Sequence, residues 1–289
     1  MASSEPDLPP EVQAILERQL DSFTMEHNNI GTNSFVSVLH TDKGEYVVKR
    51  ARNTYAKKAI HREFDKLSIL FPGHPGTFEV PEPVSSQESV YTVLKHIDGI
   101  DGSQVWAAAN HSERLHLLKE IAAILKRIHA CQVDGIEPLR ATSRETSQSW
   151  YQSHLVMAKS LYNRRLAQEG TSPESQAALD NIAAMEHALA DDGLWQPAFN
   201  TISFLHGDFM LPNVIFRQED GILLAVGMVD WADCGYGDAR YDLASMLWSI
   251  GYNSKNLQAK TIQEYKTASL AAYDHVYKDK SDAYFTPWK

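Results

Sequence analysis

The sequence predicts an α+β protein with two lobes, a small amino-terminal lobe with an antiparallel sheet and a larger helical carboxy-terminal lobe. Two observations lead to this fold class. Strand-like alternation of apolar residues is frequent before Gly99, whereas helical spacing dominates after it. The 289 residues, of which 43% are hydrophobic, suit two lobes around one cleft. We expect the first lobe to span residues 1–97 and the second to span residues 98–289.

Turn and helix signals divide the amino-terminal lobe into strands and helices. Pro9–Pro10 is a helix-start signal, and the turn cluster from Thr41 to Gly44 joins two strand-like runs into a β-hairpin. In chain order, the expected elements are a helix from Pro9–Pro10, strands at 35–39 and 45–49, a helix at 54–70 ended by a Pro- and Gly-rich loop at 71–76, and a strand at 90–94.

Helical spacing characterises most of the carboxy-terminal lobe. Leu118, Ile121, Leu125 and Ile128 recur on one helical face, which predicts a core helix. The turn residues 218–221 separate two short strand-like runs. The expected helices are 115–128, 149–168, 173–191, 240–252 and 259–277, and the expected strands are 214–216 and 223–226.

Charge and cysteine usage narrow the class of protein. The formal net charge of −10 argues against nucleic acid as a partner, because phosphate backbones bind to concentrated basic surfaces. No apolar run approaches the ~20 residues that cross a bilayer, and residues 1–10 lack the features of a signal peptide. Cys131 and Cys234 are the two cysteines, so a disulfide framework is excluded. We expect a cytoplasmic protein with neither a membrane nor a nucleic-acid partner.

The most informative stretch runs from His206 to Asn213 and is followed by an apolar strand that leads to Asp230. Asp208 lies in a Pro-containing loop, where its carboxylate can face a hydroxyl group. The amide oxygen of Asn213 and the carboxylate of Asp230 are oxygen ligands of the kind that Mg²⁺ prefers. Phosphoryl transfer needs a base that orients the nucleophile and a metal ion that neutralises phosphate charge. Taken singly, Asp208 and Asn213 could equally be turn residues.

These residues resemble the motifs of a known family, the aminoglycoside phosphotransferase-like small-molecule kinases, which share the bilobal protein-kinase fold. The order of expected elements fits that family over nearly the whole chain, and residues 204–244 carry its specific motifs. Those motifs are H-G-D-x-x-x-x-N at His206, Gly207, Asp208 and Asn213, a hydrophobic-Asp-Trp motif at Val229, Asp230 and Trp231, and G-D-x-x-x-D-L-A from Gly237 to Ala244. Leu211–Pro212–Asn213 looks like the aminoglycoside 3'-phosphotransferase branch.

The resemblance implies a role for each residue of the loop. Asp208 would be the catalytic base, and Asn213 with Asp230 would hold Mg²⁺. Asp242 would brace the loop, although an acid in the first turn of a helix can also serve the helix dipole alone. We interpret His206 as a structural residue that hydrogen-bonds the loop backbone.

The resemblance implies that Lys49 holds the α- and β-phosphates, because it lies on the strand from Glu45 to Arg50, where the kinase plan has a lysine. The helix that follows this strand supports the assignment. Glu63 on that helix would orient Lys49 by ion pairing, and Asp65 is the competing carboxylate. Arg50 is the competing cation, but its side chain is expected on the opposite face of the strand. The structural alternative for Lys49 is a solvated lysine at a strand end.

Two further segments are candidates for nucleotide contacts. Residues 28–35 lie between two strands and could cover the triphosphate, with Ser34 as the contact. This loop has a single glycine and is equally well described as an Asn-rich turn. The segment from Lys95 to Gly99, including Ile97, would be the hinge whose backbone meets the adenine.

The acceptor is expected to be a small molecule. The span between Asp230 and Arg240 contains no A-P-E motif and leaves no room for a peptide-presenting segment. Acidic side chains in the helical lobe would favour a cationic amino sugar, and aromatic side chains would favour an apolar acceptor such as a macrolide. The candidate lining residues are Trp150, Tyr151, Tyr162, Asp233, Glu264 and Asp274.

We therefore predict a kinase that uses ATP or GTP with Mg²⁺ to phosphorylate a hydroxyl of a small molecule. An aminoglycoside or a similar amino sugar or antibiotic is the favoured acceptor. Macrolide, choline, homoserine and ketosamine kinases are alternatives, as are a nucleotide-binding pseudokinase and a metal hydrolase that uses His206 and Asp208. Family members serve antibiotic resistance or metabolism, and both roles stay open. The chain is expected to act as a monomer or a homodimer.

Overall fold

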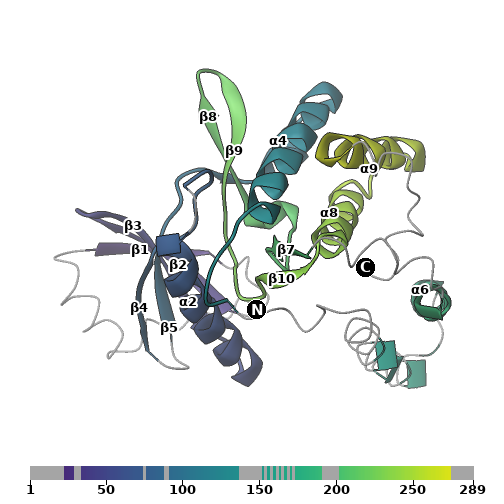
Figure 1. The fold of residues 1–289 in the computed structure, drawn as a ribbon, viewed down its shortest axis with the longest axis horizontal. Helices are drawn as coiled ribbons and strands as arrows, with labels where there is room; N and C mark the ends of the chain where they lie inside the picture. Colours follow the sequence, from purple (N-terminus) through teal and green to yellow (C-terminus); the bar gives the residue numbers. More distant parts are fainter. Residues whose placement is uncertain are drawn as a thin grey trace.

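The computed structural model describes residues 23–28, 34–73, 76–87, 91–136, 173–190 and 202–274, together with single positions between 152 and 170. An antiparallel sheet lies on one side of the molecule, and most of the helices lie on the other side (Figure 1). The helix expected at Pro9–Pro10 and residues 29–33 of the expected phosphate loop fall outside the described residues. Among the described residues, no helix is both long and apolar enough to cross a membrane.

The amino-terminal sheet has five antiparallel strands in the order β1-β2-β3-β5-β4. The expected hairpin is present and is longer than predicted, with Val36 opposite Lys49 in the register. β4 was missed, because it opens with Pro83 and is rich in serine; proline is tolerated there since β4 lies at the sheet edge. The strands are β1 (Phe23–Asn28), β2 (Ser34–Thr41), β3 (Gly44–Ala51), β4 (Pro83–Gln87) and β5 (Tyr91–Lys95).

Helix α2 (Thr54–Gly73) packs against β3, β4 and β5 of this sheet. The side chain of Asn53 accepts a hydrogen bond from the Ala56 N–H at 2.9 Å, which caps the first turn. Ile60, Leu67 and Leu70 are buried on the face toward the sheet. The helix continues to Gly73 rather than ending at residue 70, because a proline in the last turn removes only one hydrogen bond.

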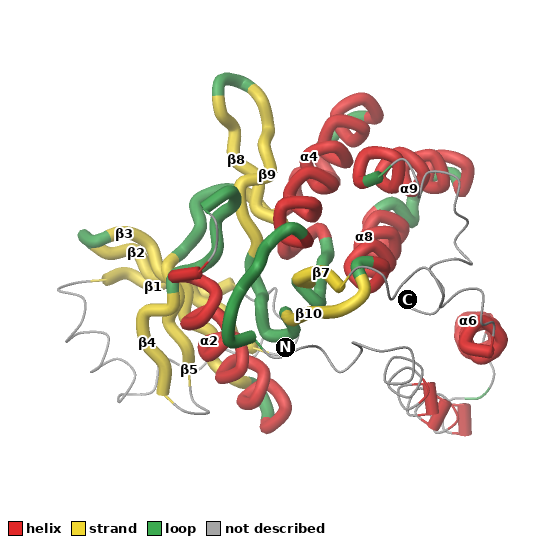
Figure 2. The backbone as a smooth tube through the Cα atoms, viewed as in Figure 1, coloured by secondary structure: helices red, strands yellow, loops and turns green. Residues whose placement is uncertain are grey.

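Figure 2 shows the helices of the second lobe gathered on the far side of the molecule from the five-stranded sheet. Helix α4 buries Leu118, Ile121, Leu125 and Ile128, as predicted. The elements are β6 (Ile100–Asp101), α3 (Gly102–Ala108), α4 (His111–His129), α6 (Pro173–Ala190), β7 (Ile202–Leu205), the 3₁₀ helix η2 (Leu211–Asn213), β8 (Val214–Glu219), β9 (Ile222–Met228), β10 (Gly235–Asp238), α8 (Arg240–Asn253) and α9 (Ala259–Tyr273).

The hairpin of β8 and β9 projects away from the rest of the molecule (Figure 1). Asp220 and Gly221 form its turn with positive φ angles of 49° and 81°. Two such residues in succession are typical of a type I′ turn, whose twist matches that of the strands. Both strands were predicted, and each extends beyond its predicted range.

Several short elements were not expected. Strands β6, β7 and β10 have two to four residues each, too few for a clear alternation. Helix α3 begins where the Asp101 carboxylate accepts hydrogen bonds from the Ser103 and Gln104 N–H groups. Helix α9 ends at Tyr273, short of the predicted residue 277, and Asp274 is already extended. The described positions within the expected helix at 149–168 are helical, and its other positions fall outside the described residues.

Candidate active site

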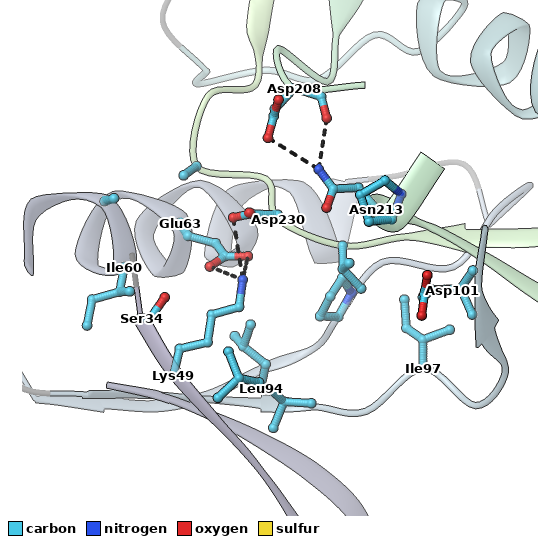
Figure 3. A pocket seen from close by; sticks show the side chains of 18 of the residues that line it. Ser34, Lys49, Ile60, Glu63, Leu94, Ile97, Asp101, Asp208, Asn213 and Asp230 are labelled. Carbon is cyan, nitrogen blue, oxygen red and sulfur yellow. Dashed lines mark hydrogen bonds and ion pairs between the residues drawn. The ribbon is translucent and has the colours of Figure 1, made fainter. Parts of the chain in front are cut away.

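A cavity of about 540 Å³ lies between the five-stranded sheet and the helical lobe. Strands β2, β3 and β5, helix α2 and the loop after β7 all contribute to its lining. Figure 3 shows that polar side chains from both lobes face one another across it. The cavity collects the predicted residues Ser34, Lys49, Glu63, Lys95, Ile97, Asp208, Asn213 and Asp230.

Lys49 is a cation of the cavity wall and is held by two carboxylates. Its Nζ lies 2.7 and 2.8 Å from the two oxygens of Glu63 and 3.4 Å from Asp230 Oδ1. Glu63 is only 1% exposed, so this ion pair is almost fully removed from water. Burial alone would lower the pKa of Lys49, but Asp230 and Glu63 outweigh it and raise that pKa above its usual range. Lys49 is therefore a firmly charged ammonium group at the cavity wall.

The loop from His206 to Asp208 is fixed by buried hydrogen bonds. His206 Nε2 lies 3.0 Å from the Val229 carbonyl oxygen, and Nδ1 accepts from the Asp208 N–H at 3.3 Å. These partners require the neutral tautomer with hydrogen on Nε2, and burial lowers the pKa of His206 accordingly. His206 hydrogen-bonds the loop backbone, as the sequence predicted.

Gly207 permits a very close approach of two backbone segments. Its φ is +83°, and a Cβ atom there would lie 2.0 Å from the Asp233 carbonyl oxygen. The Gly207 N–H donates to Asp242 Oδ1 at 2.9 Å, and the His206 N–H donates to Asp242 Oδ2 at 2.8 Å. Asp242 is fully buried and holds both amides of the loop from helix α8.

Asp208 and Asn213 are joined through the loop. The Asn213 side-chain nitrogen donates to the Asp208 carbonyl oxygen at 2.9 Å and to its carboxylate at 3.3 Å. Since both partners are acceptors, the amide oxygen of Asn213 is left for another ligand (Figure 3). Residues 211–213 form one turn of 3₁₀ helix, where a loop without helix was expected. Burial, with Asp230 and Asp233 nearby, raises the pKa of Asp208 to about 6.

Asp230 lies between Lys49 and this loop in a left-handed backbone conformation, with φ of +68°. A non-glycine residue in this region is uncommon and marks a constrained position. Lys49 lowers the pKa of the Asp230 carboxyl group despite burial, so the group is an anion. The following N–H, of Trp231, donates to Glu63 at 3.3 Å, which links the segment to helix α2.

Helix α2 makes three more hydrogen bonds with this segment that the sequence did not reveal. Arg62 donates from Nε to the Ala232 carbonyl oxygen at 2.7 Å and from a terminal nitrogen to the Asp233 carboxylate at 2.6 Å. Lys66 donates to the Cys234 carbonyl oxygen. No local pattern marks these cations, because their partners lie about 170 residues away in the chain.

Sequence comparison agrees with this geometry. Residues 28–277 match the family described as the phosphotransferase enzyme family. The chain belongs to this family. Viomycin phosphotransferase from Streptomyces vinaceus is 26% identical over 218 residues, which span 71% of this chain and 68% of that relative.

Solved phosphotransferases have the same fold. The gentamicin–APH(2'')-IIa complex matches with a TM-score of 0.65 and 20% identity, over 96% of this chain and 85% of that one. Macrolide 2'-phosphotransferase MphH from Brachybacterium faecium matches with a TM-score of 0.62 and 17% identity, over 97% and 87% of the two chains. The predicted family and the predicted two-lobed kinase-like fold are thus confirmed, and the chain is a phosphotransferase.

The nucleotide-contact candidates of this phosphotransferase all lie at the cavity. Ser34 is the first residue of β2 and lines the cavity. The Lys95 and His96 N–H groups donate to the Glu82 and Glu45 carbonyl oxygens, at 2.8 and 2.9 Å. These two donors are therefore used inside the protein, and Ile97 is the next residue along the wall.

The competing candidates lie elsewhere. Asp65 is half-exposed on helix α2 and faces His61 at 3.5 Å rather than Lys49. The guanidinium of Arg50 lies 5.0 Å from the centre of the Phe35 ring. Phe35 of β2 pairs with Arg50 of β3. The neighbouring pair, Val36 and Lys49, lines the cavity. Arg50 is therefore on the opposite face of the sheet.

The acceptor candidates are scattered. Asp233 lines the cavity. Glu264 lies 3.5 Å from His111, the first residue of α4. His129, the last residue of α4, is about 27 Å from His111 along the helix. His129 contacts Asp242 behind the loop, so Glu264 is remote from Asp208. Asp274 follows helix α9. Trp150, Tyr151 and Tyr162 fall outside the described residues.

The oxygen atoms near Asp208 suit a hard cation that would also be coordinated by a bound ligand. The amide oxygen of Asn213 and the carboxylate of Asp230 are oxygen donors, the type that Mg²⁺ prefers. In the described part of the chain, no group of three or more His, Cys, Asp or Glu side chains is arranged to hold a metal ion. Mg²⁺ sites of this kind are completed by water and substrate phosphates. The residues present fit such a site.

Proposed function

We propose that this phosphotransferase transfers the γ-phosphoryl group of ATP or GTP to a hydroxyl of a small cationic molecule, an aminoglycoside or a similar amino sugar or antibiotic. The observation that carries the proposal is the convergence of Lys49, Asp208, Asn213 and Asp230 on one cavity. These four supply a phosphate-binding cation, a base and two metal ligands, the parts that phosphoryl transfer uses.

On the nucleotide side, Lys49 binds the α- and β-phosphates while Glu63 fixes the position of its ammonium group. Ser34, the first residue of β2, contacts the phosphates. The adenine or guanine lies between the apolar side chains of β2 and β5 and meets the backbone at Lys95 and Ile97. Because the Lys95 and His96 N–H groups have partners in the protein, the N–H donor to the base is that of Ile97.

On the transfer side, Asn213 and Asp230 would hold the metal ion, and Asp208 orients the acceptor hydroxyl. Mg²⁺ when bound neutralises the charge that develops on the phosphates. The hydroxyl proton passes to the Asp208 carboxylate while the hydroxyl oxygen bonds to the γ-phosphorus and the nucleoside diphosphate leaves. With a pKa of about 6, Asp208 is mostly ionised at neutral pH and is a stronger base than an ordinary aspartate.

The acceptor class rests on charge and on the relatives. Five acidic side chains line the cavity against three cations, and the chain carries a formal net charge of −10. The acids are Glu63, Asp101, Asp208, Asp230 and Asp233, and the cations are Lys49, Arg62 and Lys95. Such a site favours ammonium groups. The named relatives act on viomycin or bind gentamicin, and one is a macrolide phosphotransferase. A macrolide is therefore the second candidate acceptor.

The first experiment compares wild-type protein with Asp208→Asn in Mg²⁺-dependent transfer from radiolabelled ATP or GTP to gentamicin, viomycin and erythromycin. Loss of the base is expected to lower kcat by about 10²–10⁴-fold, with nucleotide affinity retained. Asp65→Asn is the matched control, because it makes the same change on an exposed face of α2. Near-normal turnover of Asp208→Asn would refute the assignment of the base.

A further inference from the structure

Arg62 is a cation of the cavity that the proposed chemistry does not yet use. It lines the cavity from helix α2, and its side chain is 44% exposed. Lys49 is engaged with the α- and β-phosphates in the proposed function, so no side chain is assigned to the oxygens of the γ-phosphoryl group. These oxygens carry charge in the transition state, and phosphoryl-transfer enzymes can stabilise that charge with an arginine.

One edge of the Arg62 guanidinium is fixed by the protein. Nε donates to the Ala232 carbonyl oxygen at 2.7 Å, and Nη2 donates to the Asp233 carboxylate at 2.6 Å. Two bonds along one edge fix the plane of the group. In the described part of the chain, no acceptor is bonded to Nη1. The edge formed by Nη1 and Nη2 therefore keeps two parallel N–H groups, the fork that binds an oxyanion in bidentate fashion.

The fixed edge attaches this guanidinium beside the loop that carries Asp208. Asp233 packs directly on that loop, because a Cβ atom at Gly207 would lie 2.0 Å from the Asp233 carbonyl oxygen and 3.1 Å from its Cβ. Asp233 also follows Asp230 by three residues, and all these carboxylates line the cavity together with Arg62. Arg62 is thus held next to the base, at the end of the cavity where the γ-phosphoryl group must meet the acceptor hydroxyl.

Helix α2 thereby contributes to two ion pairs at the cavity through adjacent residues. Glu63 holds the ammonium group of Lys49 at 2.7 Å, and Asp233 holds the guanidinium of Arg62 at 2.6 Å. In both pairs a carboxylate orients a cation before any ligand binds. A triphosphate in this acidic cavity would be repelled by the carboxylates around it, and preoriented cations offset that repulsion without a cost of reorganisation.

We propose that Arg62 is a further catalytic residue, which donates from its free edge to the oxygens of the γ-phosphoryl group during transfer. Its other edge keeps the segment after Asp230 in place at the same time. No bond is made to Arg62 and it neither gains nor loses a proton, so its contribution is electrostatic. The inference rests on the proposed function and deepens it at the γ-phosphoryl end of the site.

The test separates catalysis from simple attachment of the segment. Calorimetric titrations with Mg²⁺ measure binding of ADP and GDP and of the non-hydrolysable imido analogues of ATP and GTP. Phosphoryl transfer to gentamicin, viomycin or, without an acceptor, to water measures kcat. Arg62→Ala is expected to lower kcat on the order of 10²-fold and to lower the preference for triphosphate over diphosphate about tenfold.

Two further variants control for the attachment. Lys66→Ala removes a hydrogen bond between α2 and the Cys234 carbonyl oxygen, but Lys66 lies outside the cavity lining. It should lower the unfolding temperature and leave the preference for triphosphate unchanged. Lys66 also shows that a lysine can hold a carbonyl oxygen of this segment. Arg62→Lys is therefore expected to recover thermal stability but not kcat or the triphosphate preference, because an ammonium group has no second edge.

The outcomes distinguish this inference from the proposed function. The same triphosphate preference in wild type and Arg62→Ala would overturn the catalytic role and leave Arg62 as an attachment of α2. Recovery of kcat by Arg62→Lys would overturn the role of the free edge. Both results are read as ratios to a wild-type protein that binds nucleotide and transfers phosphate. Failure of the wild type to do either would overturn the proposed function itself.

Discussion

The partial burial of Asp208 has two opposing effects, one on its strength as a base and one on the stability of the folded protein. Its partial burial raises its pKa to about 6, which strengthens it as a base. The same burial opposes ionisation, so a charged Asp208 destabilises the folded protein at neutral pH. A pKa raised from 3.8 to about 6 corresponds to at most about 3 kcal/mol, because one unit is ~1.4 kcal/mol.

Asp208→Asn is therefore expected to unfold at a higher temperature than wild type at pH 7.5 in the absence of metal and nucleotide. A carboxyl group with a raised folded-state pKa stabilises the folded protein fully only when the pH is below the pKa of the unfolded state. This contribution to the free energy of unfolding is lost as the pH rises through the pKa of the folded state. The gain from Asn should thus be a few degrees at pH 7.5, shrink below pH 6 and vanish below about pH 4. Thermal melts across this range measure it. A gain that is independent of pH would contradict the burial argument.

The residues of the site differ in how visible they are in the sequence. Asp208, Asn213 and Asp230 belong to short motifs whose spacing is local, so the sequence alone was enough to nominate them. Arg62 and Lys66 belong to no such motif. They meet Asp233 and the Cys234 carbonyl oxygen only after the chain folds. Their position depends on tertiary packing, which residue types do not encode.

At the scale of elements, the ends of three helices meet behind the loop from His206 to Asp208. His129 ends α4, Tyr273 ends α9, and Asp242 lies in the first turn of α8. The Tyr273 hydroxyl lies 2.6 Å from His129 Nδ1, and His129 Nε2 lies 3.2 Å from Asp242 Oδ2. Asp242 thus accepts from a side chain and from two backbone amides in a buried position. The loop is therefore positioned by these helices as well as by the hydrogen bonds among its own residues.

Asp242→Asn should therefore be damaging although it preserves size. One carboxylate oxygen becomes an NH₂ group that cannot accept, so a buried N–H or the His129 ring loses its partner, at about 1–3 kcal/mol. We expect a clear drop in kcat and in the free energy of unfolding, measured by turnover and by chemical denaturation. Tyr273→Phe deletes one outer hydrogen bond and should cost about 1 kcal/mol or less. Equal effects of the two variants would argue against the loop-bracing role.

Element prediction succeeded where the periodic signal was long. Helix α4 and the β8–β9 hairpin carry clear apolar spacing or a strong turn signal, and both were found. Helix α3 and strand β10 were missed because they are short. Helix α3 depends on the Asp101 cap, and β10 exists only by pairing with β7, which is distant in the sequence. Such elements are stabilised by contacts that a scan of neighbouring residues does not contain.

At the scale of the whole molecule, an aromatic stack joins the amino-terminal part to the helical part. Trp231 is fully buried and stacks on Phe78 on one side at 6.0 Å and on Phe204 at 6.2 Å. Nearby, the Arg217 guanidinium binds both oxygens of Glu79 and the Asp98 carbonyl oxygen. One continuous core includes residues of α2, β5, α4 and α8. The lobe boundary between residues 97 and 98 stays a prediction. Buried residues on both sides of this boundary belong to the same core.

We expect unfolding to be a single cooperative transition that Phe78→Ala shifts strongly. Removing a buried phenylalanine ring costs about 3–5 kcal/mol. Ile69→Ala is the control, because Ile69 is 38% exposed on α2 and should change stability by about 0.5 kcal/mol or less. Coincident fluorescence and circular-dichroism transitions would support a shared core. Two separated transitions in the wild-type protein would show that the lobes unfold independently.

Helix α2 is fastened to the segment after Asp230 by Arg62, Glu63 and Lys66 together. A switch that worked by swinging this helix outward would have to break all three attachments at once, with Glu63 leaving Lys49 as well. Helix α2 and the segment after Asp230 are therefore expected to move together as one unit of the folded protein.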